Sequence, residues 1–169
     1  MERKELPLHL VYLWVSWNNS RNKPRGESKT NKNNNNSNNN RILLVDDEPD
    51  ITTVFTLGLE DNGFKVDAFN DPIQALSGFK SGLYDLALID YKMPNMNGFE
   101  LYREIRKIDE RVKVCFVTAF EVYYEELKNI FQPSSIASPE HKEEDVNCFI
   151  QKPIDIDELV KRINEELNS

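Results

Sequence analysis

Cysteine is scarce in this 169-residue chain, which contains only Cys115 and Cys148. Both lie in apolar runs, and they do not form the C-x-x-C spacing typical of zinc ligands, so a thiolate metal site is not expected. Isolated cysteines in apolar surroundings are usually small buried side chains, and intracellular proteins keep them reduced. We therefore predict two reduced, buried thiols.

The chain also lacks a hydrophobic run that is long enough to cross a bilayer. The apolar stretch LPLHLVYLWVSW spans residues 6–17, whereas a membrane-spanning helix needs about 20 residues. It is a poor export signal, because residues 2–5 balance in charge and no small-x-small cleavage site follows. The Asn-rich tract at 31–40 has nothing to bury. We expect residues 1–40 to form a disordered tail, in which 6–17 is functionless, makes a weak membrane or partner contact, or acts as an export signal.

Basic charge is scarce in the body of the chain. Residues 41–169 carry 14 Lys and Arg against 26 Asp and Glu, whereas residues 1–40 carry a net charge of +4. A nucleic-acid-binding domain needs a basic face for the phosphates. We therefore expect no direct contact between this body and DNA or RNA.

From residue 41 onward, strand-like and helix-like segments alternate. Short apolar runs predict strands, and stripes with helical spacing predict helices. The predicted strands are 42–45, 64–69, 86–90, 112–118 and 147–151, and the predicted helical stripes are 51–59, 72–79, 99–108, 120–131 and 156–167. This alternation predicts an α/β fold with an open, doubly wound parallel sheet, because five units are too few for an eight-stranded barrel.

Polar residues follow four of these predicted strands. Ligands of open parallel sheets lie beyond the carboxyl ends of the strands. If the first and third strands are neighbours, their acids meet in one crevice, and Mg²⁺ (or Mn²⁺) is the natural counter-ion for such a cluster. A carboxylate there could serve as a nucleophile for a phosphoryl group, and a hydroxyl and an ammonium could bind its oxygens. The polar strand ends are Asp46, Asp47 and Glu48, then Asp90, then Thr118, then Lys152.

Four motifs in these segments resemble those of a response-regulator receiver domain of two-component signalling. They are RILLVDDEPD (41–50), LALIDYKMPNMNGFEL (86–101), VCFVTAF (114–120) and FIQKPID (149–155). The resemblance covers residues 41–169 and implies a flavodoxin-like (βα)5 fold with strand order 2-1-3-4-5. It also implies a phosphorelay role in the cytoplasm, with a sensor histidine kinase or a phosphotransfer protein as the donor.

The resemblance assigns the chemistry to particular residues. Asp90 matches the phosphoacceptor. Asp46 and Asp47 match the acidic pair that holds the metal together with Asp90, and the backbone carbonyl of Lys92 matches a further metal ligand.

Other matched positions concern switching and lifetime. Thr118 resembles the switch hydroxyl, Phe149 the switch aromatic, and Lys152 the phosphate-binding lysine that precedes an expected cis peptide at Pro153. Lys92 and Phe120 occupy the positions that tune phosphoryl lifetime. A bulky Phe120 predicts slow self-dephosphorylation, because it could shield the acyl phosphate from water.

One segment departs from the family pattern. Residues 132–147 form a longer, more acidic connection than the usual short Gly-Ala turn, so the usual output face of the fourth helix, fifth strand and fifth helix is in doubt. The loop is either a private partner site or only a solvated loop. We expect a stand-alone receiver that acts by binding another protein, or by relaying or draining phosphate, and not an enzyme beyond its own phosphorylation and dephosphorylation.

Three alternatives remain open from the sequence. A pseudo-receiver scaffold would have the same residues without using them, since filled positions show capacity alone. An Asp-nucleophile phosphatase of the haloacid dehalogenase class would need D-x-D after the first strand, where this chain has Asp46-Asp47-Glu48. A flavodoxin-like nucleotide binder would need a Ser/Thr/Gly-rich loop at the same place, and the acidic loop repels phosphate.

Overall fold

A computed structural model describes residues 40–119 and 148–169 of the chain. Its centre is a five-stranded parallel sheet with the order β2-β1-β3-β4-β5, which confirms the predicted doubly wound fold. The strands are β1 (Arg41–Val45), β2 (Lys65–Phe69), β3 (Leu86–Asp90), β4 (Lys113–Thr118) and β5 (Cys148–Gln151). The first and third strands are neighbours, as the site prediction required.

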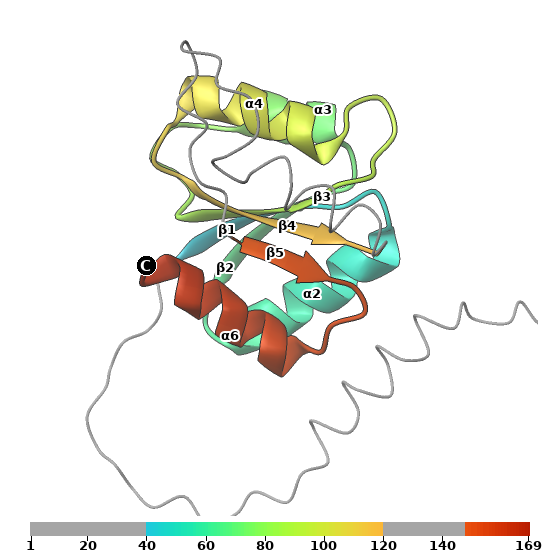
Figure 1. Cartoon of the computed structure of the whole chain (residues 1–169), viewed down its shortest axis with the longest axis vertical. Coiled ribbons are helices and arrows are strands. Elements are labelled where there is room, and N and C mark those ends of the chain that lie inside the picture. Colours follow the sequence, from blue (N-terminus) through green and yellow to red (C-terminus); the bar gives the residue numbers. More distant parts are fainter. Residues whose placement is uncertain (1–39, 120–147) are drawn as a thin grey trace, which may run out of the picture.

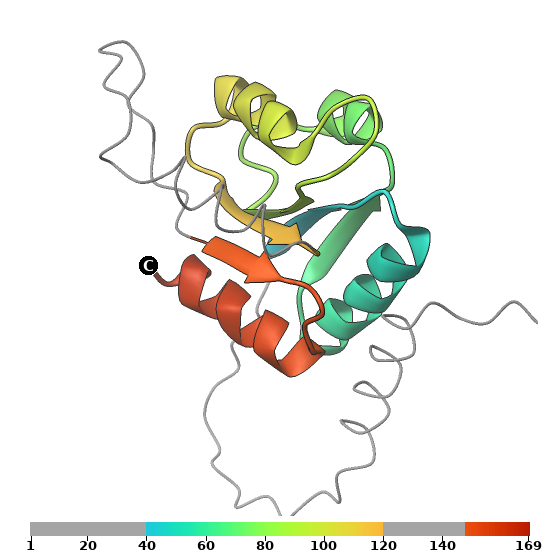
Figure 2. The same cartoon turned by 45° about the vertical axis from the view of Figure 1, so that its right-hand side comes forward.

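Helices cover both faces of this sheet, as Figures 1 and 2 show: α3 and α4 lie over one face, and α2 and α6 over the other. The described helices are α2 (Pro49–Asp61), α3 (Pro72–Gly78), α4 (Gly98–Ile108) and α6 (Ile156–Leu167). The predicted helix at 120–131, the loop at 132–147 and the tail up to residue 39 lie outside the described residues. Within the described ranges, no helix combines the length and hydrophobicity needed to cross a membrane.

Side-chain caps mark the start of three of the described helices. Asp71 and Asp155 act as N-caps, because their side chains accept hydrogen bonds from the backbone N–H groups of the second or third helical residues. Asn97 and Glu100 form a reciprocal capping box at the start of α4. These caps fix where α3, α4 and α6 start relative to the strands that precede them.

Two hydrophobic layers form the core, one on each face of the sheet. Along β1, Leu43 and Val45 face α3 and α4, whereas Ile42 and Leu44 face α2 and α6. All five residues of β3 are buried, as expected of a central strand covered on both faces. The predicted helix at 99–108 is confirmed, but its last residue, Ile108, is 45% exposed, whereas Leu101 is fully buried.

The prediction of two reduced thiols is also wrong, because Cys115 and Cys148 form a disulfide bond in the structure. They are directly opposite each other on the neighbouring strands β4 and β5, with a Cα–Cα distance of 4.5 Å that a disulfide can bridge. Both cysteines are buried in the layer beneath α6. The bond therefore joins the two strands that lead to Thr118 and Lys152.

Candidate functional site

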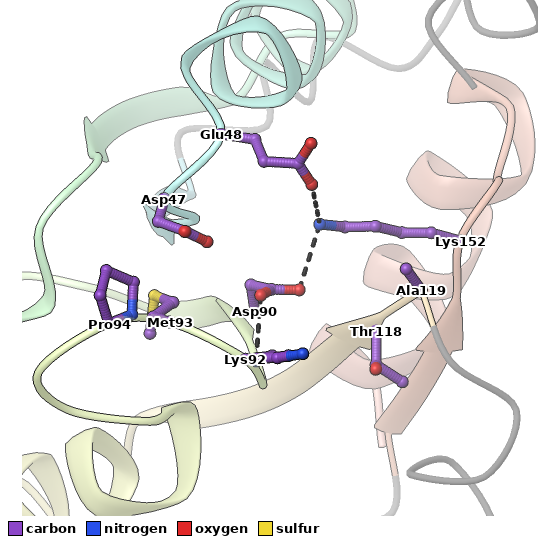
Figure 3. A pocket seen from close by; sticks show the side chains of 9 residues that line it. All are labelled: Asp47, Glu48, Asp90, Lys92, Met93, Pro94, Thr118, Ala119 and Lys152. Atoms are coloured by element: carbon purple, nitrogen blue, oxygen red, sulfur yellow. Dashed lines mark hydrogen bonds and ion pairs between the residues drawn. The ribbon is translucent and has the colours of Figure 1, made fainter. Parts of the chain in front are cut away.

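The predicted polar strand ends come together at one edge of the sheet. In parallel strands all carboxyl ends point the same way, so residues after β1, β3, β4 and β5 surround one pocket of about 450 Å³. Figure 3 shows its lining, which consists of Asp47, Glu48, Asp90, Lys92, Met93, Pro94, Thr118, Ala119 and Lys152. Asp46 lies beside the pocket, within ion-pair distance of Lys152. The sequence did not single out Met93, Pro94 or Ala119.

Lys152 joins the acids of two different strands. Its ammonium Nζ lies 2.5 Å from Oδ2 of Asp46 and 3.1 Å from Oδ1 of Asp90, and it donates hydrogen bonds to both. Oε1 of Glu48 is 3.9 Å away (Figure 3). Burial alone would lower the pKa of Lys152, but Asp46 and Asp90 outweigh it and raise the pKa. The lysine is therefore a fixed positive charge at the centre of the site.

The two oxygens of Asp90 have different partners. Oδ1 accepts from Lys152, and Oδ2 accepts from the backbone N–H of Lys92 at 3.0 Å. The side chain is 9% exposed. Burial, together with the charges of Asp46 and Asp47, raises the pKa of Asp90 to about 6, although Lys152 acts in the opposite direction. Asp90 is thus a carboxylate at neutral pH, and each of its oxygens accepts a hydrogen bond. Its ionisation nevertheless costs more free energy here than in water.

This raised pKa predicts how Asp90 affects stability when a chelator removes metals. The folded state binds the Asp90 proton more tightly than the unfolded state, whose pKa is near 4. The stabilising effect is therefore present below pH 4 and is lost as the pH rises through about 6. We expect Asp90→Asn to increase the free energy of unfolding at pH 7.5 by about 2 kcal/mol, with a smaller gain near pH 4.

Urea unfolding across this pH range measures the effect. Adding Mg²⁺ is the control, because a cation that stabilises the carboxylate should shrink the difference between the two proteins. An Asp90→Asn protein that is less stable than the wild type at pH 7.5 in chelator would contradict the prediction.

The donor set of the pocket fits a small, hard cation. Asp46, Asp47 and Asp90 each offer a carboxylate oxygen, and these atoms lie within 4.8 Å of one another. Oxygen ligands of this type are those that Mg²⁺ uses, usually together with several waters. Two of the three carboxylates are buried, so a divalent ion would relieve the repulsion that burial strengthens. The acidic pocket of this chain is therefore suited to a divalent cation such as Mg²⁺.

Thr118 and Phe149 occupy different surroundings. Thr118 ends β4, is 1% exposed, and lines the pocket. Phe149, in the middle of β5, packs on the α3 and α4 side and stacks against Phe116 at a centroid distance of 5.9 Å. Lys152 and Pro153 are joined by the predicted cis peptide bond. The switch role of Phe149 stays a prediction, and Phe120 lies outside the described residues.

Gly98, the first residue of α4, lies directly against the end of β3. A Cβ atom at this position would collide with the backbone carbonyl oxygen of Asp90 and lie 3.1 Å from Cγ2 of Ile89. We expect Gly98→Ala to lower the free energy of unfolding by about 1–3 kcal/mol, because the strand end or the helix must shift. Gly78→Ala is the matched control, since its closest contact would be an ordinary 3.5 Å from Phe69. Equal stabilities of the two variants in urea would contradict the steric argument.

Comparison with known sequences identifies the class to which this fold and site belong. The model of the response regulator receiver domain matches residues 42–164 of the chain. The chain therefore belongs to the receiver-domain family of response regulators, which function in two-component signal transduction.

Individual relatives agree with this assignment. The response regulator ArlR of Staphylococcus saprophyticus is 32% identical over 126 residues, which cover 75% of this chain and 51% of that protein. The chain thus spans about half the length of the curated relatives that it matches.

Two solved structures have the same fold. A CheY-like receiver domain protein from Methanospirillum hungatei is 25% identical with a TM-score of 0.63, and the match covers 77% of this chain and 94% of that one. TrrA from Thermotoga maritima, solved in complex with Mg(2+)-BeF, is 30% identical with a TM-score of 0.60, covering 75% and 97%.

Proposed function

We propose that this chain is a phosphoacceptor in which Asp90 receives a phosphoryl group from a phosphohistidine of a sensor kinase or phosphotransfer protein. The observation that supports this most strongly is the position of Lys152, whose ammonium contacts both Asp46 and the acceptor Asp90 in one pocket. A positive charge at this point can stabilise the negative charge on the phosphoryl oxygens as the group is transferred to Asp90.

Several groups of the chain itself would take part in the transfer. One carboxylate oxygen of Asp90 attacks the phosphorus, while the bond between phosphorus and the donor's imidazole nitrogen breaks. Lys152 neutralises charge on the transferred group, and the hydroxyl of Thr118 donates to one of its oxygens. The backbone N–H of Lys92 orients Asp90 through its hydrogen bond to Oδ2. These contacts position the reactants, which is the main contribution that a protein makes to phosphoryl transfer.

Magnesium is part of the proposal. Asp46, Asp47 and Asp90 would hold it, with the backbone carbonyl of Lys92 as a further ligand. When bound, Mg²⁺ supplies positive charge that stabilises the phosphoryl oxygens during transfer. Lys152 remains the positive group that the chain itself provides.

The consequence of phosphorylation would be a changed affinity for another protein. Phosphorylation biases a two-state arrangement of loops or helices in many switches. The proposed output surfaces are the family's usual face, formed by the predicted helix at 120–131 with β5 and α6, and the segment 132–147. Residues 120–147 lie outside the described residues. We propose that the chain works in the cytoplasm, binds no nucleic acid directly, and catalyses no reaction beyond its own phosphorylation and dephosphorylation.

The test is incubation of the purified chain with acetyl phosphate and Mg²⁺, followed by mass spectrometry of the intact protein. We expect a gain of one phosphoryl group. The gain should disappear in Asp90→Asn and in the presence of a chelator. A wild-type protein that gains no phosphoryl group would favour the phosphate-independent scaffold, and steady release of phosphate from a phosphomonoester would favour the phosphatase.

A further inference from the structure

The acidic turn after β1 must hold three adjacent carboxylates beside Asp90. Backbone and side-chain contacts fix its first residue: the N–H of Asp46 donates to the carbonyl of Phe69 at 3.1 Å, and the Asp46 carboxylate accepts from the N–H of Glu48 at 3.0 Å. The backbone carbonyl of Asp46 accepts a further hydrogen bond, of 2.7 Å, from Nδ2 of Asn70, which follows β2.

Asn70 makes a second hydrogen bond with the same nitrogen. Its Nδ2 lies 3.0 Å from the hydroxyl of Thr52, a buried residue in the first turn of α2. That hydroxyl also lies 3.0 Å from the carbonyl of Pro49, which can only accept, so Thr52 donates there and accepts from Asn70. The two N–H groups of one amide thus have two acceptors, and this arrangement fixes which end of the amide is the nitrogen.

The two acceptors flank the acidic turn. Asp46 stands at its start and Thr52 lies just beyond its end, so the side chain of Asn70 ties both sides of the segment 47–49 to the end of β2. Aspartate at position 70 would place a fourth carboxylate next to this segment, and alanine would remove both bonds. An amide is therefore the group that stabilises the turn without adding charge to it.

We propose that Asn70 is a positioning residue that holds Asp46 and Asp47 in the arrangement that binds the divalent cation. This inference rests on the proposed magnesium role of the two acids. Groups that orient metal ligands without touching the metal typically contribute about 10- to 100-fold to metal affinity. We expect Asn70→Ala to weaken Mn²⁺ binding by about tenfold.

Binding is measured with Mn²⁺ alone, from the electron paramagnetic resonance signal of the free ion during titration of the full chain. Thr52→Val removes one of the two bonds of Asn70 and should weaken binding by a smaller factor. In the double variant the effects should not add, because both act through the same amide. Asn62→Ala is the matched control, since its side chain donates to the carbonyl of Gly58 at the other end of α2, and it should bind Mn²⁺ as the wild type does.

If Asn70 had a structural role alone, Asn70→Ala would lower the free energy of unfolding without changing the affinity for Mn²⁺. Phosphorylation by acetyl phosphate adds a second readout: Asn70→Ala should need more Mn²⁺ for half-maximal rate but reach a similar rate at saturation. Thermal unfolding confirms that Asn70→Ala is folded. A folded variant that binds Mn²⁺ with the wild-type affinity would overturn the inference. Failure of the wild type itself to bind Mn²⁺ would instead refute the proposed function.

Discussion

Lys152→Met is expected to slow the phosphorylation of Asp90 by at least about a hundredfold at saturating Mg²⁺ and acetyl phosphate. The variant keeps a long side chain but removes the ammonium that contacts Asp46 and Asp90. Removing one preorganised group that stabilises charge in a buried site typically costs about 10²- to 10³-fold in rate. The pKa of Asp90 should rise further, because Lys152 is the group that lowers it.

The rate is measured from the mass of the intact protein over time. Lys113→Met is the matched control, because Lys113 begins β4 at the opposite edge of the sheet and its ammonium contacts the backbone carbonyl of Glu166. We expect the control to be phosphorylated at the wild-type rate. A Lys152→Met protein that does the same would show that the ammonium contributes nothing to transfer.

Reduction of the Cys115–Cys148 bond is expected to lower the free energy of unfolding by about 3–4 kcal/mol. The bond closes a loop with a sequence separation of 33, and a cross-link over such a length removes much of the entropy of the unfolded chain. A reducing cytoplasm, which is the proposed location, normally keeps cysteines as thiols. The redox state of this pair therefore has a large effect on the free energy of unfolding of the chain there.

Both sulfur atoms are buried, so reduction is done in concentrated urea before refolding with and without dithiothreitol. Urea titrations then compare the two forms of the wild type. The double variant Cys115→Ala/Cys148→Ala is the control, because its stability should not respond to the reductant. A wild type whose unfolding midpoint is the same in both conditions would contradict the expectation. Phosphorylation should persist in the reduced protein, since neither sulfur atom lines the pocket.

The alternation of strands and helices could be predicted because its signals are local. The run 86–89 is apolar throughout because helices cover both of its faces, and caps such as Asp71 and Asp155 mark helix starts without reference to the rest of the fold. The strand order, by contrast, could not be predicted from local signals, because the alternation alone does not specify which strands are neighbours. It was implied only by the resemblance to receiver domains.

The core of the site could also be predicted, because parallel strands bring their carboxyl ends to one edge. That rule places Asp46, Asp90 and Lys152 together although they are far apart in the sequence. The same rule could have found Asn70, which follows β2 directly and is polar. Nothing in the sequence singles it out, because an amide has no charge and carries no recognisable chemistry of its own.

The disulfide could not be predicted, because it depends on the register between β4 and β5. Cys115 and Cys148 are direct partners in the observed pairing. A shift of one residue would turn one of them to the other face of the sheet, and nothing local to either strand specifies the register. The exposure of Ile108 has a simpler cause, because the last residue of a helix can leave the stripe that the preceding turns define.

The most direct test of Asp90 as the phosphoacceptor is to identify the residue that carries the phosphoryl group. Borohydride reduces an acyl phosphate of aspartate to homoserine, so treatment of the phosphorylated chain followed by peptide mass spectrometry reveals the acceptor. We expect homoserine at position 90 and unmodified aspartate at 46 and 47. Homoserine at Asp46 or Asp47 with position 90 unchanged would contradict the assignment of Asp90 as the acceptor.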